Sequence, residues 1–120
     1  TNLSTWFTCG KFNKSQNGGI IKCNSKKIVE DIKIVSSYHD DYSKYMKMVG
    51  ALLVGPNECL KFYKYLVKYA DERIDQYYHK PWIDNLDIFH SISIDLPEKQ
   101  VFSFNTIQEY NLMLSFFKGK

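Results

Sequence analysis

The sequence predicts an α/β fold, in which a mixed sheet containing a β-hairpin packs against helices. Short segments with alternating or continuous apolar residues, typical of strands, are interleaved with segments whose apolar residues recur every three or four positions, typical of helices. At 120 residues, of which 44% are hydrophobic and 24% charged, the chain is long enough for one core and too short for two. We therefore expect residues 1–120 to form a single domain or a half-domain.

The first third of the chain predicts strands. Residues 3–9 form a short apolar segment, and residues 11–19 form a polar loop that ends in two glycines. Residues 20–35 predict a β-hairpin with its turn at 24–27. The second arm alternates in the manner of a half-buried strand, with Glu30 interrupting its apolar face. That face consists of Ile28, Ile32 and Ile34.

The middle third predicts a polar loop, a strand and a helix. Residues 36–44 are polar, and the continuously apolar run at 46–54 predicts a strand buried on both faces. Gly55 and Pro56 then mark a turn into a helix, because proline is tolerated in the first helical turn. The apolar stripe predicted for this helix consists of Cys59, Phe62, Tyr63, Leu66 and Ala70.

The last third predicts helices and strands in alternation. Pro81 opens a short helix that is predicted to run through residue 89, and residues 91–96 and 100–104 predict two further strands. Thr106 and Glu109 form a capping box for the final helix. The predicted apolar face of that helix consists of Ile107, Tyr110, Leu114 and Phe117.

The charge and cysteine content argue against a nucleic-acid-binding protein and against a zinc protein. The net charge is +3, the lysines are scattered among carboxylates, and Arg73 is the only arginine, so we do not expect nucleic-acid binding. The chain has three cysteines, and they lack the spacing of a zinc site: Cys9, Cys23 and Cys59. We therefore expect free thiols and a reducing, cytoplasmic compartment. We also expect Cys59 to pack on the apolar face of its helix. No apolar run reaches the roughly 18 residues of a membrane span, so we expect no membrane partner.

The sequence contains no recognisable catalytic machinery. It has no G-x-S-x-G motif and no glycine-rich phosphate-binding loop. The Gly18-Gly19 pair precedes a predicted strand, whereas anion sites occur at the start of a helix. The run of His39, Asp40 and Asp41 predicts a solvated loop, because adjacent loop residues point in different directions.

The most suggestive segment for function is YYHKPWIDNLDIFH, at residues 77–90. One hypothesis is a binding pocket, in which Tyr77, Tyr78 and Trp82 form an apolar wall while Asp84 and Asn85 supply directed hydrogen bonds. A second is that these aromatic residues belong to the core. A third is a metal site, since carboxylates and imidazoles bind divalent ions. Its ligands would be His79, Asp84, Asp87 and His90.

Four segments, in order, carry a resemblance to a known family. They are GGIIKC with KKIVEDIKIV, MKMVGALLVGP, YYHKPWIDNL and FSFNTIQEY. Together they resemble the C-terminal half of the sugar-phosphate nucleotidyltransferase family, and most closely its small bacterial choline-phosphate cytidylyltransferase-like members. The resemblance implies the C-terminal half of a Rossmann-like domain. It also implies an enzyme that joins a small phosphorylated acceptor to the α-phosphate of a nucleoside triphosphate, with magnesium as cofactor.

For this chain the resemblance implies an acceptor-binding role. The WIDN stretch matches a family position beside the acceptor, which assigns substrate binding to Tyr78, Trp82, Asp84 and Asn85. Asn105 stands where many relatives carry a magnesium-ligating aspartate; the amide is a poorer ligand, and capping of the last helix is its alternative role.

The family's nucleotide-binding loop belongs to an N-terminal half that these residues do not contain. We therefore expect the chain to be inactive alone, with an exposed apolar sheet face or edge, and to require the missing half or self-association. The alternative function is a non-catalytic module whose exposed aromatics bind a partner or a sugar.

Overall fold

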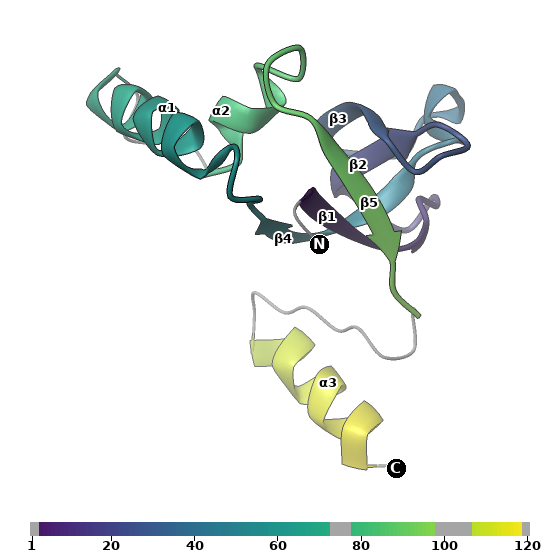
Figure 1. Ribbon diagram of the computed structural model, residues 1–120. Coiled ribbons are helices and arrows are strands. Elements are labelled where there is room, and N and C mark those ends of the chain that lie inside the picture. Colours follow the sequence, from purple (N-terminus) through teal and green to yellow (C-terminus); the bar gives the residue numbers. More distant parts are fainter. Residues whose placement is uncertain (1–2, 73–77, 98–106, 119–120) are drawn as a thin grey trace.

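A computed structural model describes residues 3–72, 78–97 and 107–118 (Figure 1). Its centre is a five-stranded sheet in the order β3-β2-β4-β1-β5, in which β1 and β5 run parallel and the other neighbours run antiparallel. The mixed sheet with a hairpin and packed helices confirms the predicted α/β class. The strands are β1 (Ser4–Lys11), β2 (Gly18–Cys23), β3 (Val29–Val35), β4 (Met46–Leu53) and β5 (Ser91–Asp95).

The hairpin of β2 and β3 forms as predicted, with a turn that the Asn24 side chain stabilises. The Asn24 carboxamide oxygen accepts hydrogen bonds from the backbone N–H groups of Lys26 (2.9 Å) and Ile28 (3.1 Å). The predicted apolar face of β3 is buried only at Ile32, because Ile34 is 50% exposed and Ile28 is 43% exposed. Ile34 lies in β3, which is the outer strand of the described sheet, and Ile28 immediately precedes that strand.

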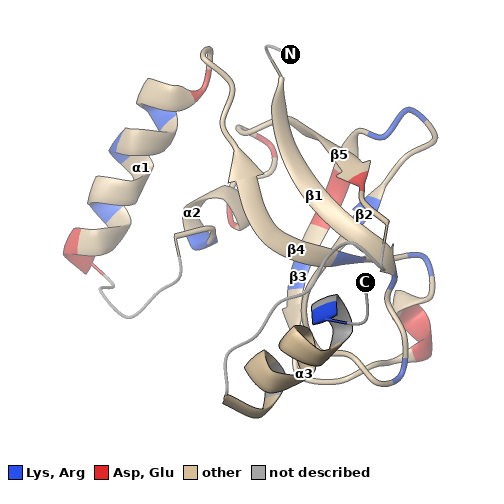
Figure 2. Cartoon of the chain, turned by 90° about the horizontal axis from the view of Figure 1, so that it is seen from below, with Lys and Arg blue, Asp and Glu red and all other residues tan. Residues whose placement is uncertain are grey.

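Helices α1 (Cys59–Glu72) and α2 (Lys80–Ile83) lie toward one end of the sheet and above it in Figure 1. Helix α3 (Ile107–Lys118) lies below the sheet in that view, and in front of it when the chain is seen from below (Figure 2). Helix α1 and the short helix α2 pack with Trp6 of β1 into the main core. Among the described residues, no helix is both long and apolar enough to cross a membrane.

The main core is an aromatic cluster that joins β1, α1 and α2. The rings of Trp6, Phe62, Trp82 and Phe89 are all nearly or fully buried. Trp82 lies 5.2 Å from Phe62 in an edge-on arrangement and 4.7 Å from Phe89 in a stacked one, measured between ring centroids. Such ring pairs contribute about 0.5–1.5 kcal/mol each beyond the area that they bury.

The carboxylate of Glu58 fixes the start of α1 to this core. One of its oxygens accepts from the Ser4 hydroxyl at 2.6 Å, and the other accepts from the backbone N–H of His90 at 2.9 Å. The Ser4 oxygen in turn accepts from the backbone N–H of Gly55 at 2.8 Å. A single side chain thus links the first strand, the α1 N-terminus and the residue that precedes β5.

Helix α1 forms where proline and spacing predicted it, but a different face is buried. Phe62 is the buried residue of α1, whereas Tyr63 is 61% exposed and Cys59 and Ala70 are also exposed. Cys59 is therefore a solvent-exposed thiol, and its predicted packing role is wrong. The helix is rotated toward Trp6 and Trp82, so that its half-buried residues are Tyr65, Leu66 and Tyr69.

The prediction that residues 46–54 form a strand buried on both faces is also wrong. The strand exists, but within β4 only Met48 is buried, and Leu53 is 54% exposed. The reason is that β2 pairs with β4 only near Met46 and Lys47, which leaves the later part of β4 with β1 as its strand partner within the described sheet.

The helix predicted from Pro81 through residue 89 ends early. It covers Lys80–Ile83, with Pro81 in its first turn, and then gives way to turns. Asn85 redirects the chain: its side chain donates to the Pro81 carbonyl at 2.8 Å, and its own carbonyl accepts from Ile88 and Phe89 at 2.9 Å each.

The last part of the chain is described only over α3. This helix occurs where it was predicted, but Ile107 on its predicted apolar face is 73% exposed, while Leu114 is half-buried. The predicted strand at 100–104 and the capping residue Thr106 lie outside the described residues.

Candidate functional site

The segment that begins at Tyr78 lies beside an irregularity in β4. The Tyr78 hydroxyl donates a hydrogen bond to the Gly50 carbonyl, and its ring stacks on His79 with a 5.2 Å centroid separation. Gly50 has a φ of 89°, a conformation that glycine adopts without strain. Tyr78 remains 49% exposed, and burial of its hydroxyl raises the pKa of Tyr78.

The irregularity at Gly50 is a bulge between β1 and β4. Trp6 pairs with Leu52, and Thr8 pairs with Met48, so that three residues of β4 lie opposite the single residue Phe7. Bulges occur often beside functional sites, where they redirect a strand and its side chains. Tyr78 is therefore a partly exposed phenol held at a bulge, and its substrate-binding role stays a prediction.

Trp82 lies in the core. Its side chain has no exposed surface and is enclosed by Trp6, Phe62 and Phe89. This position agrees with the hypothesis that the aromatic residues belong to the core, and the buried ring is not accessible to a ligand. A substrate-binding role for Trp82 stays a prediction, and it requires this cluster to open.

Asp84 and Asn85 are brought together with Tyr69 at the junction of α1 and α2. One Asp84 oxygen lies 2.9 Å from the Lys80 ammonium, and the other accepts from the Tyr69 hydroxyl at 3.2 Å. The Asn85 side chain donates to the same hydroxyl at 3.2 Å. Burial raises the pKa of Tyr69, which keeps the hydroxyl neutral and able to donate. The arrangement holds one carboxylate, one amide and one phenol close together, with Asp84 exposed to solvent.

The metal-site hypothesis for this segment is wrong. Among the described residues, no group of three or more His, Cys, Asp or Glu side chains could hold a metal ion. His79 is buried, and this burial lowers its pKa and favours the neutral ring. Asp87 and His90 are exposed and separate. Asn105 lies outside the described residues, so its metal role stays a prediction.

Sequence reasoning missed a further polar site at the carboxyl ends of β1 and β5. One oxygen of Asp95 accepts from the Thr8 hydroxyl at 2.7 Å and from the Gly10 backbone N–H at 2.9 Å. Open α/β sheets bind ligands beyond the carboxyl ends of parallel strands, and β1 and β5 are such a pair. The available signal was an aspartate directly after the alternating S-I-S-I run. The sequence alone does not show that β5 pairs with β1, so the contact of Asp95 with Thr8 and Gly10 could not be predicted.

Comparisons with known proteins show a shared fold. No family model matches the chain, and no curated protein matches its sequence. Among solved structures, the chain is similar to the CTP:phosphocholine cytidylyltransferase from Streptococcus pneumoniae, with a TM-score of 0.76 at 15% identity. The match covers 98% of this chain and 49% of that enzyme, so the chain spans about half of its length. These residues therefore share the fold of about half of that enzyme.

Proposed function

We propose that this chain is the acceptor-side half of a nucleotidyltransferase. The enzyme would transfer a nucleoside monophosphate from a nucleoside triphosphate to a small phosphorylated acceptor, such as a sugar phosphate or a choline phosphate-like compound. The observation that carries the proposal is the superposition of 98% of the chain on half of an enzyme that uses CTP and phosphocholine. The ordered family-like segments of the sequence support the same assignment.

In this reaction, a phosphate oxygen of the acceptor attacks the α-phosphorus of the triphosphate. The bond from the α-phosphorus to the oxygen that bridges the β-phosphorus breaks, and pyrophosphate leaves. Such displacements depend on the positioning of the two reactants. The sequence has no phosphate-binding loop and one arginine, so triphosphate binding is assigned to a region other than these residues.

Acceptor contacts are assigned to the α1–α2 junction and to Tyr78. The exposed Asp84 carboxylate suits a cationic or hydroxylated acceptor, and the Asn85 amide and the Tyr69 phenol lie beside it. Tyr78 adds a partly exposed ring at the β4 bulge. Trp82 would not contact the acceptor directly. Its buried ring would hold α2 in place, and Asp84 and Asn85 directly follow that helix.

The proposed role also accounts for an apolar face of the sheet. Leu53 pairs with Thr5, and Ile94 pairs with Phe7, so that all four lie on the face opposite Trp6. Leu53 is 54% exposed, and Ile94 is 42% exposed. Thr5 on the same face is buried, so the exposed apolar surface consists of these two side chains on either side of β1. Apolar surface that is left exposed can serve as an interaction site. We assign it to the missing N-terminal half or to self-association.

Magnesium is implied by the resemblance, but the described residues do not supply a site for it. They contain no cluster of three potential metal ligands, and Asn105 lies outside them. The proposal therefore routes no step of the reaction through a metal bound by this chain.

The test compares the product of the complete reading frame with the 120-residue chain. Each is incubated with one of the four ribonucleoside triphosphates and either choline phosphate or glucose 1-phosphate, and pyrophosphate release is measured. We expect release from the longer protein and none from the 120-residue chain. Asp84→Asn in the longer protein should raise KM for the acceptor and leave KM for the triphosphate unchanged. Absence of release with every pair, or an unchanged acceptor KM in the variant, would contradict the proposal.

A further inference from the structure

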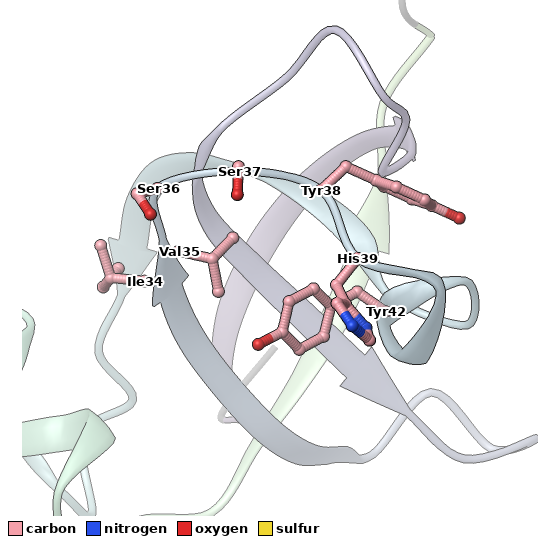
Figure 3. Close-up of a pocket in the computed structure, with 7 residues that line it drawn as sticks. All are labelled: Ile34, Val35, Ser36, Ser37, Tyr38, His39 and Tyr42. Atoms are coloured by element: carbon pink, nitrogen blue, oxygen red, sulfur yellow. The ribbon is translucent and has the colours of Figure 1, made fainter.

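A separate cavity opens where the chain leaves β3. It has a volume of about 360 Å³, toward the lower end of the roughly 300–1,000 Å³ of small-molecule sites, which suits a ligand the size of one ring. Figure 3 shows the seven residues around it. They are Ile34, Val35, Ser36, Ser37, Tyr38, His39 and Tyr42. We propose that this cavity binds a neutral sugar ring, independently of nucleotidyl transfer.

The proposed platform for the sugar is the ring of Tyr42. Val35 and this ring point toward one another beneath the turn, and His39 lies beside the ring (Figure 3). Tyr45 packs edge-on against Tyr42 at 5.7 Å, and Phe12 lies 6.4 Å from Tyr42, both measured between ring centroids. Both supporting rings are buried. The platform is therefore held in place before any ligand arrives, which lowers the entropic cost of binding.

Hydrogen-bonding groups surround the platform. The backbone N–H of Asp41 donates to the His39 Nδ1 atom at 3.2 Å, which places the ring proton on Nε2 in the neutral imidazole. The Asp41 carboxylate lies 3.4 Å from the same nitrogen and pairs with it only when the ring is protonated. The neutral ring thus offers an Nε2–H donor. The exposed hydroxyls of Ser36 and Ser37 can both donate and accept.

The composition of the cavity does not favour a phosphorylated ligand. None of its seven lining residues is a lysine or an arginine, so no fixed positive charge lines the cavity to neutralise a phosphate. A flat nucleobase is also a poor fit. The lining rings of His39 and Tyr42 are inclined at 64° to each other, so these two rings do not form a parallel slot for a base. A single aromatic platform with hydroxyl and N–H groups around it suits the apolar face and the hydroxyls of a pyranose.

The experiment is a titration of the ¹⁵N-labelled chain with each ligand at constant pH, followed by the backbone amide signals. The probes are methyl glucoside, N-acetylglucosamine, cytidine and inorganic phosphate, each tested alone. We expect one or both sugars to shift the amide signals of Ser36, Ser37 and His39 in a saturable manner. Cytidine and phosphate should leave these signals in place. Shifts caused by cytidine or phosphate and not by a sugar would overturn the proposal, as would no shift with any probe.

Two variants and a matched control test whether the Tyr42 ring itself contributes to sugar binding. Tyr42→Leu keeps apolar bulk but removes the aromatic face, and it should weaken sugar binding by about tenfold, equivalent to about 1.4 kcal/mol. Tyr63→Leu, at an exposed tyrosine of α1, should bind as the unmodified chain does. If Tyr42→Leu does not fold, His39→Ala at an exposed position should still weaken binding several-fold. Unchanged affinity in the folded variants would place the sugar elsewhere and refute the assignment.

Discussion

Replacing Trp82 by alanine distinguishes a core residue from a pocket wall. The indole has no exposed surface, and its centroid lies 4.7 Å from that of Phe89, 5.2 Å from Phe62 and 6.4 Å from Trp6. Truncation of a buried tryptophan costs about 3–5 kcal/mol, because apolar contacts are lost and a cavity remains. Small domains have free energies of unfolding of about 5–15 kcal/mol, so Trp82→Ala should remove a large part of the total.

The matched control is Trp82→Phe. The Nε1 donor of Trp82 is buried without a hydrogen-bond partner among the described residues, and an unsatisfied group of this kind costs about 1–3 kcal/mol. Phenylalanine removes that donor and keeps most of the ring contacts, so we expect a loss of less than about 1.5 kcal/mol. Urea denaturation followed by circular dichroism measures both variants without depending on tryptophan fluorescence. If Trp82→Ala unfolds at the urea concentration of the unmodified chain, the core argument is refuted.

Three further perturbations test the other contacts. Glu58→Ala removes the carboxylate that accepts hydrogen bonds from Ser4 and His90 at the start of α1. The free energy of unfolding of this variant should fall by about 1–3 kcal/mol. The control Glu72→Ala, at an exposed position of α1, should leave the free energy of unfolding almost unchanged. Burial and the hydrogen bond to Asp31 raise the pKa of Tyr45, so the stability from its neutral hydroxyl is present below about pH 10 and is lost as the pH rises further. Tyr45→Phe should flatten that alkaline loss in urea titrations, and equal slopes would count against the argument. Leu53→Lys should reduce self-association in sedimentation velocity, whereas a monomeric unmodified chain at high concentration would contradict an interaction role for the exposed sheet face.

Local patterns predicted the strands and helices better than they predicted burial. Alternation and turn residues are properties of neighbouring positions, so the hairpin and the start of α1 could be located from the sequence. Burial depends on which elements meet. In α1, apolar residues occur around most of the helix, and Leu60 and Tyr63 are 66% and 61% exposed although both suit a core. Phe62 is buried because it packs against Trp82 in the core that also contains Trp6, and both tryptophans are distant from it in sequence.

The order of strands could not be predicted for the same reason. The placement of β1 between β4 and β5 joins residues near 6 with residues near 52 and near 93. Nothing local to any one of these segments specifies the other two. The acceptor of the Thr8 hydroxyl, Asp95, therefore becomes recognisable only after the sheet is known.

At the polar junction of α1 and α2, the side chains that we propose for acceptor binding also make contacts within the chain. A fold shared at 15% identity constrains the order of elements and leaves open the contacts of individual residues. Each oxygen of Asp84 has one partner among the described residues, and a carboxylate oxygen can accept more than one hydrogen bond, so the proposed acceptor could bind beside Lys80 and Tyr69 or displace one of them. The ion pair with Lys80 is partly exposed, and pairs of this kind contribute about 0–1 kcal/mol. Displacement of Lys80 by the proposed acceptor would therefore cost little, and the Tyr69 hydrogen bond and the packing of Phe62 on Trp82 would still join α1 to α2.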